Sequence, residues 1–170
     1  APLTHETRPG RSWRLVGEDP PVEWLADGLV PVAGLVVLAA EPNAGKTLLV
    51  LDLALRAAHG LDWLGRSVRP CSTVYVAAEG GRGLGARMRA WSAAHPAAVP
   101  ADGCYLHVDE GPLVDLGRDD AVAQLEQVLA SASAANGGRR PNVVVIDTLA
   151  LALPGADEND AGAMGAALAA

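Results

Sequence analysis

The feature that most constrains this chain is an apolar run that ends in a short polar turn and is followed by a second apolar segment. The run covers residues 34–40, and the turn and the two residues after it read Glu41-Pro42-Asn43-Ala44-Gly45-Lys46-Thr47. An apolar run that stops at a turn indicates a buried strand, and the segment over 45–59 consists mostly of good helix formers. The sequence therefore predicts a strand, a tight loop and a helix in direct succession.

A loop of this composition suits a phosphate group. Small residues let successive backbone N–H groups point at the oxygens of an anion. Lys46 would contact the β- and γ-phosphates of a nucleotide, and the hydroxyl of Thr47 would bind Mg²⁺. The residues expected to line the nucleotide are Glu41, Pro42, Asn43, Ala44, Gly45, Lys46, Thr47 and Leu48. We therefore expect ATP and Mg²⁺ as cofactors.

The basic residues support this interpretation. The chain has 13 of them, and Lys46 is the only lysine. A compact, mobile ammonium suits phosphate better than the planar guanidinium of arginine does. The usual loop pattern, G-x-x-x-x-G-K-[ST], begins with glycine, whereas the first position here is Ala40. Alanine is the next smallest residue, and it fits if its φ angle stays negative.

Short apolar runs alternate with helical segments along the rest of the chain. Strands are predicted over 72–79, 104–109 and 142–148, and helices over 83–95 and 118–135. The last strand is continuous and β-branched, which is typical of a strand covered on both faces. Four residues of the last helix fall on one apolar face, namely Val122, Leu125, Val128 and Leu129. This alternation predicts an α/β fold with a doubly wound parallel sheet.

Two acidic residues end predicted strands. Asp147 ends the apolar run that begins at residue 142, and it is the expected acid that orients the magnesium shell. Many ATPases place a glutamate directly after this aspartate, but residue 148 is a threonine. Glu79 is the other candidate, because a carboxylate at a strand end could polarise the water that attacks the γ-phosphate. The predicted catalytic residues are Glu79 and Lys46, and the predicted metal ligands are Thr47 and Asp147.

These motifs, in this order, resemble the RecA-like superfamily of P-loop ATPases. More narrowly, they resemble the RepA-like branch of hexameric replicative helicases found on plasmids, phages and other mobile elements. The resemblance covers roughly residues 22–170 and includes AAEPNAGKT, DWLG, VYVAAEGG and VVVIDTLALALPGADEND. It implies a RecA-like P-loop core, Glu79 as the catalytic base, Asp147 as the Walker B acid and a homo-oligomeric ring.

The same resemblance implies segments that do not occur before Ala170. A further strand with a polar sensor would lie between the Walker B strand and the loop strand, and an arginine finger would come later. Residues 1–31 contain several prolines and show little periodicity, so we expect an N-terminal arm or linker there. Residues 32–170 are expected to form a partial RecA-like ATPase domain, incomplete at its C-terminus. The piece is expected to be inactive alone. The longer parent is expected to be a DNA replication helicase or a related DNA-dependent ATPase.

Two alternatives remain open. The segment 81–86 reads GRGLGA and fits G-x-G-x-x-[GA], and Asp109 ends the next predicted strand. That pattern is typical of a dinucleotide-binding unit, and the parent would then be an NAD-dependent oxidoreductase. A regulatory module that binds nucleotide without hydrolysing it would share the phosphate-binding loop.

Composition narrows the class of protein further. The net charge of −7 argues against a broad nucleic-acid-binding face, so single-stranded DNA would bind through regions outside this piece. No apolar run approaches the roughly 18 residues that span a bilayer, so no membrane is expected as a partner. Cys71 and Cys104 share no ligand spacing, and they are expected to act as small apolar groups in a reducing compartment, the cytoplasm.

Overall fold

The structure is a computed structural model, and it describes residues 21–77, 83–111 and 114–153. The elements in chain order are β1 (Trp24–Ala26), β2 (Val30–Pro31), α1 (Lys46–His59), β3 (Thr73–Ala77), α2 (Leu84–Ala94), β4 (Leu106–Asp109), α3 (Ala121–Ala135) and β5 (Val143–Asp147). Strands β3, β4 and β5 form a parallel sheet in the order β4-β3-β5. The predicted alternation of strands and helices is therefore confirmed from α1 to β5.

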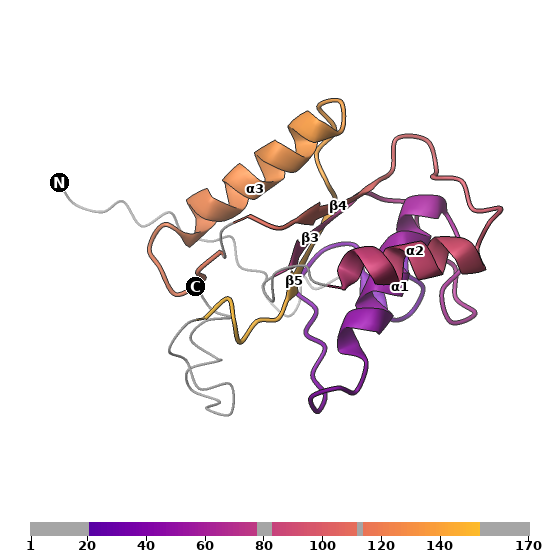
Figure 1. The fold of residues 1–170 in the computed structure, drawn as a ribbon, viewed down its shortest axis with the longest axis horizontal. Coiled ribbons are helices and arrows are strands. Elements are labelled where there is room, and N and C mark those ends of the chain that lie inside the picture. The colour runs from indigo at the N-terminus through magenta and orange to yellow at the C-terminus, as the bar shows by residue number, and fades with distance from the viewer. Residues whose placement is uncertain (1–20, 78–82, 112–113, 154–170) are drawn as a thin grey trace, which may run out of the picture.

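Helices cover both faces of this sheet. Helix α3 lies on one side of the strands, and α1 and α2 lie on the other (Figure 1). On the α3 side, Val74 and Val76 belong to one apolar cluster with Ala132, whereas on the other side Tyr75 packs with Leu51. Successive residues of a strand point to opposite faces, so the central strand β3 is buried on both. The fold is α/β with a doubly wound parallel sheet, as predicted.

The prediction of a buried strand over 34–40 is wrong. Residues 35–40 have no regular secondary structure, and the side chains of Leu35, Val36, Val37 and Leu38 are between 44% and 68% exposed. A strand is stabilised by hydrogen bonds and side-chain pairs with a neighbouring strand. Within the described ranges no strand pairs with this segment. The loop and helix nevertheless follow it at the predicted positions.

Two smaller expectations also need correction. Strand β5 pairs with β3 alone among the described residues, and Val144 is 40% exposed, so β5 is not covered on both faces. Helix α3 begins at Ala121 instead of residue 118, after a turn in which Arg118 forms an ion pair with Asp120. Val122 is 72% exposed and lies off the packed face, where the other three predicted apolar residues of the helix are partly buried.

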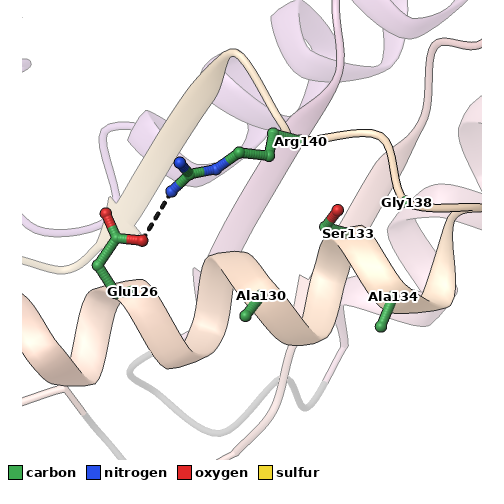
Figure 2. A pocket seen from close by; sticks show the side chains of 6 residues that line it. All are labelled: Glu126, Ala130, Ser133, Ala134, Gly138 and Arg140. Carbon is green, nitrogen blue, oxygen red and sulfur yellow. Dashed lines mark hydrogen bonds and ion pairs between the residues drawn. The ribbon is translucent and has the colours of Figure 1, made fainter.

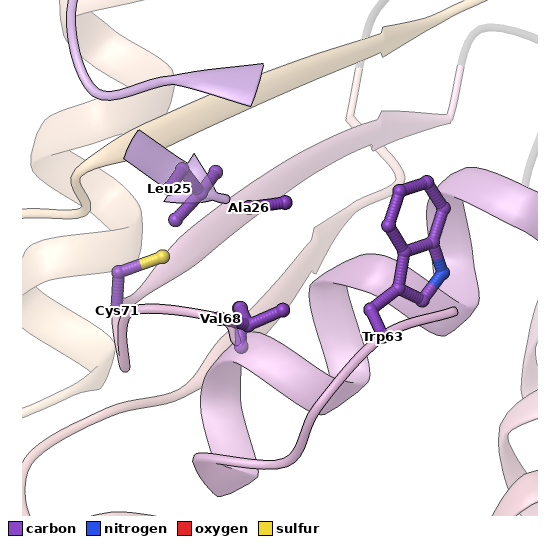
Figure 3. Packing of buried hydrophobic residues seen from close by; sticks show 6 residues of the cluster. Leu25, Ala26, Trp63, Val68 and Cys71 are labelled. Carbon is purple, nitrogen blue, oxygen red and sulfur yellow. The ribbon is translucent and has the colours of Figure 1, made fainter. Parts of the chain in front are cut away.

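Residues 24–31 form a small antiparallel hairpin, β1–β2, where the sequence predicts an extended arm. Leu25 and Ala26 are buried in a cluster with Trp63, Val68 and Cys71 (Figure 3). The backbone N–H of Arg69 donates to the carbonyl of Leu25, which ties the hairpin to the segment after α1. These residues are therefore folded onto the domain. The predicted division at residues 31 and 32 stays a prediction.

Two simple expectations from composition can be compared with the structure. Cys71 and Cys104 are both free thiols; Cys71 is buried and Cys104 is half-buried. Burial raises the pKa of the Cys71 thiol from 9.0 to about 11, so this group stays protonated and apolar near neutral pH. None of the helices in the described residues is long and apolar enough to cross a membrane.

Candidate functional site

The loop before α1 has the tight backbone that its composition predicts. Gly45 is the N-cap of α1 and has φ 91° and ψ 15°, a left-handed conformation that glycine adopts readily. The backbone N–H of Ala44 donates to the carbonyl of Glu41 at 3.2 Å and closes the turn. Asn43 and Leu64 are the non-glycine residues with positive φ in the described part of the chain. Ala40 is not one of them, so alanine fits the first position of the motif without this strain.

The N-terminus of α1 is open to an anion. No side chain caps it, and its first turn contains no acidic residue. The backbone N–H of Leu49 donates to Gly45 at 3.0 Å, so the N–H groups of Lys46, Thr47 and Leu48 precede the first residue that can bond within the helix. These unpaired donors and the helix dipole favour negative charge at this end. The predicted nucleotide-lining residues 41–44 are exposed beside it.

Lys46 lies across the loop. Its Nζ donates to the carbonyl oxygens of Ala40 at 2.5 Å and Glu41 at 3.1 Å. Both acceptors are backbone groups that keep the ammonium at the loop without neutralising its charge. The side chain is only half-buried, so the ammonium can reach an anion that binds to the neighbouring N–H groups. The structure thus places the predicted lysine beside the open end of α1.

Thr47 and Asp147 meet although 100 residues separate them in the sequence. The hydroxyl of Thr47 donates to Oδ2 of Asp147 at 2.7 Å, and the phenol of Tyr75 donates to the same oxygen at 2.5 Å. Burial of Tyr75, then its hydrogen bond to Asp147 and the charge of that carboxylate, raise the pKa of the phenol well above its usual value. Tyr75 therefore stays protonated and acts as a donor.

These oxygens fit a magnesium ion. Hydroxyl and carboxylate oxygens are the hard ligands that Mg²⁺ prefers. Because Thr47 donates its proton to Asp147, the lone pairs of its hydroxyl oxygen stay free for a cation. Within the described ranges no group of three or more His, Cys, Asp or Glu side chains could hold a metal. A magnesium ion that binds together with nucleotide phosphates needs only one or two carboxylates, which is the arrangement at Asp147.

Two other sequence predictions involve residues outside the described ranges. Glu79 lies outside the described residues, so its role stays a prediction; Ala77, the last residue of β3, pairs in register with Asp147. Of the dinucleotide motif, Gly83 is the N-cap of α2 with φ 90°, and Asp109 ends β4. The first two residues of that motif lie outside the described ranges. The geometry of Gly83 and Asp109 leaves this alternative open.

Sequence reasoning missed Tyr75, the third member of the Asp147 group. A signal for it exists in the strand STVYVAAE, where a tyrosine interrupts a run of apolar residues. The hydroxyl of a buried tyrosine usually finds a hydrogen-bond partner. The side chain of Tyr75 is fully buried, so its partner had to be a protein group. The sequence could not specify which group, because Asp147 belongs to a different strand.

A half-buried group of polar residues, also missed, joins α1 to α2. Nε of Arg56 lies 3.0 Å from both carboxylate oxygens of Asp52, and Nε1 of Trp91 donates to Oδ1 of Asp52 at 2.7 Å. Nε2 of His95 lies 3.2 Å from the guanidinium of Arg56, and the His95 ring stacks on Trp91. We call these four residues the Asp52 cluster. Thr47, Tyr75 and Asp147 form the Asp147 cluster.

The structure also has a shallow depression on α3 (Figure 2). It is lined by Glu126, Ala130, Ser133, Ala134, Gly138 and Arg140. Its charged residues, Glu126 and Arg140, pair with each other at 2.7 Å. Helix α3 covers the face of the sheet opposite to α1, so this depression is separate from the phosphate-binding loop. Nothing in it resembles a nucleotide site.

Comparison with known proteins gives one match. A family model described as an AAA domain matches residues 6–170, which is nearly the whole chain. No curated protein and no solved structure matches the chain. The matched range includes the phosphate-binding loop, all three strands of the parallel sheet and Asp147. Together with the α/β fold, the match fits a P-loop NTPase-like core.

Proposed function

The chain belongs to the AAA domain family, and on this basis we propose that it binds ATP with Mg²⁺ at residues 41–48 and hydrolyses it within a longer protein. The observation that carries the proposal is the 2.7 Å hydrogen bond between Thr47 and Asp147, located at the open N-terminus of α1. A hydroxyl, a strand-end carboxylate and a lysine around unpaired backbone N–H groups are the parts that phosphoryl transfer needs. The first turn of α1 supplies the hydroxyl, the lysine and the N–H groups, and the end of β5 supplies the carboxylate.

The chain's own residues would divide the work of binding. The N–H groups at the start of α1 would donate hydrogen bonds to the phosphate oxygens, and Lys46 would exchange a carbonyl of its own loop for a phosphate. Thr47 and Asp147 would hold the magnesium ion, Thr47 through its free lone pairs and Asp147 through its carboxylate. When bound, the ion supplies positive charge that neutralises the phosphates.

Glu79 is the proposed general base. The residue after Asp147 is a threonine, so no acid is available there. Glu79 follows β3, whose last residue pairs with Asp147, and both strands therefore end at the same edge of the sheet. Its carboxylate would accept a proton from water as the water oxygen bonds to the γ-phosphorus and the bond to ADP breaks. Substituting Glu79→Gln in the full-length protein should preserve ATP binding while turnover collapses. Unchanged turnover would refute this role.

The finer proposal concerns the parent protein. The resemblance to RecA-like and RepA-like ATPases supports a motor domain of a DNA replication helicase or a related DNA-dependent ATPase. A homo-oligomeric ring and binding of single-stranded DNA through regions outside this piece belong to the same proposal. Stimulation of ATP hydrolysis by single-stranded DNA tests it in the full-length protein. A hydrolysis rate that does not respond to DNA would contradict the DNA-dependent motor, and nucleotide binding without any hydrolysis would favour the regulatory module instead.

The first experiment is a binding measurement with a fluorescent ATP analogue and Mg²⁺. Lys46→Ala should weaken binding and lower turnover by roughly a hundredfold or more, because it removes the charge that meets the β- and γ-phosphates. The matched control is Arg140→Ala, which removes an exposed cation that pairs with Glu126 of α3. Binding of NAD without binding of ATP would overturn the proposal in favour of the oxidoreductase alternative.

A further inference from the structure

The third member of the Asp147 cluster has no role in the function proposed so far. Tyr75 lies in the middle of β3, the central strand, and its side chain is fully buried. Its ring packs in an apolar cluster that includes Leu51 and Leu84. Only the hydroxyl is polar, and it reaches across to β5 to donate to Asp147. A phenylalanine would fill the same core, so the hydroxyl needs an explanation beyond packing.

The two donors of the cluster meet a single carboxylate oxygen. Thr47 and Tyr75 both donate to Oδ2 of Asp147, and Oδ1 accepts no hydrogen bond from any residue that the structure describes. The terminal torsion of an aspartate is soft, so one hydrogen bond alone leaves a carboxylate free to turn. Two donors from different elements, α1 and β3, fix the plane of this carboxylate and keep Oδ1 free.

We propose that Tyr75 is a positioning residue for the magnesium site: its hydroxyl holds Oδ2 of Asp147 so that Oδ1 stays turned to the hydration shell of the ion. The inference rests on the proposed function. Thr47 lies shortly after the exposed loop residues 41–44, and its hydroxyl is itself a proposed magnesium ligand, so a second donor is needed to hold the carboxylate. Tyr75 is anchored in the core and keeps its position. It would touch neither the nucleotide nor the ion.

The experiment compares the two tyrosines of the chain. Tyr75→Phe removes the hydroxyl at the site, and Tyr105→Phe is the matched control, because that hydroxyl donates to the backbone of Arg139 instead. Affinity for a fluorescent nucleotide is measured in the full-length protein, in EDTA and over a series of Mg²⁺ concentrations. Tyr75→Phe should raise the half-saturating Mg²⁺ concentration about tenfold, as loss of a group that orients a metal ligand does. Nucleotide affinity in EDTA should change less than about twofold.

Three outcomes overturn the inference. The first is an unchanged Mg²⁺ requirement in Tyr75→Phe. The second is an equal loss of affinity with and without Mg²⁺, which would indicate a structural role only. The third is a wild-type protein that binds no nucleotide, which overturns the proposed function as well. A wild-type protein that binds nucleotide with Mg²⁺, together with a silent Tyr75→Phe, removes this inference alone.

A second measurement keeps the hydroxyl of Tyr75. In a full-length protein that carries 3-fluorotyrosine at position 75 alone, introduced site-specifically, the fluorine resonance comes from that position. The resonance should shift when nucleotide and Mg²⁺ are added and stay in place when nucleotide is added in EDTA. A shift of equal size under both conditions would contradict a role toward the metal. This readout remains valid if Tyr75→Phe fails to fold.

Discussion

The Asp52 and Asp147 clusters are each built around one aspartate, but they complete its hydrogen bonds differently. Asp52 is paired with a guanidinium, and the indole N–H of Trp91 also donates to it. Asp147 receives two neutral hydroxyls on one oxygen, and in the part of the chain that the structure describes it has no ion-pair partner. A carboxylate already paired with a cation fastens two helices together. A carboxylate held by neutral donors keeps its charge for a cation that arrives from outside.

The difference between the two aspartates is tested first by the substitution Asp147→Asn. Turnover of the full-length protein should fall about a hundredfold, because the amide cannot supply the negative charge that orients the magnesium shell. The free energy of unfolding should change by less than about 1 kcal/mol, since the amide keeps the shape and an acceptor for the two hydroxyls. Steady-state ATP hydrolysis and thermal unfolding measure the two effects. A severe loss of stability would show that Asp147, like Asp52, serves mainly to stabilise the fold.

Asp52→Asn is the complementary change. The guanidinium of Arg56 loses its ionic partner, and the unfolding free energy should fall by about 1–2 kcal/mol, as expected for a half-buried charged hydrogen bond. Nucleotide affinity should stay within about twofold of the wild-type value, because Asp52 lies beyond the first turn of α1. Denaturant titration and nucleotide binding check both parts. A Mg²⁺-dependent defect in Asp52→Asn would show that the two clusters are not separate.

Alkaline pH should weaken the Asp147 cluster. The pKa of Tyr75 is raised in the folded protein, so the folded state keeps a proton that the unfolded chain loses above pH 10.0. This contribution to stability is complete below pH 10 and is lost as pH rises further, by at most about 1.4 kcal/mol per pH unit. Unfolding of the wild-type protein and of Tyr75→Phe between pH 9 and 11 tests it. Identical slopes for the two proteins would contradict the prediction.

The smallest effect is expected at the ion pair of Glu126 and Arg140. The carboxylate oxygen and the guanidinium are 2.7 Å apart, but both side chains are at least 60% exposed. Glu126→Gln should therefore change the unfolding free energy by less than about 0.5 kcal/mol. The same denaturant titration applied to Asp52→Asn gives the comparison. An equal loss in the two variants would mean that burial does not explain the strength of the Asp52 pair.

Local patterns were sufficient to predict most of the fold. Helix α1 begins within one residue of its predicted start because Gly45 and the apolar residues after it encode both the N-cap and the helix. The prediction of a strand over 34–40 was wrong because a strand also needs a partner, and the partner is not encoded in the run itself. The prediction that Val122 lies on the packed face was wrong for a related reason. Helical periodicity predicts which residues share a face, but not how far the neighbouring layer extends over that face.

The candidate site likewise contains residues that the sequence could predict and residues that it could not. The loop, Lys46 and Thr47 lie together in the sequence, and their pattern predicted them directly. The proposed role of Asp147 rests on its place at a strand end, where parallel strands bring residues to one edge of the sheet. Tyr75 could not be predicted as its partner, because the register of β3 with β5 decides which side chains meet across the strands. Glu79 stays a prediction.

Lys46 has a further consequence for chemical labelling. It is the only lysine in the chain, and its ammonium is half-exposed while it contacts the carbonyls of its own loop. An acylating reagent therefore finds a single side-chain amine in these residues, and that amine lies at the proposed nucleotide site. The rate of acylation at Lys46, followed by absorbance or by mass spectrometry, therefore reports whether the loop is occupied, and the measurement needs no amino-acid substitution. A bound triphosphate should slow it, and EDTA should reverse part of that protection.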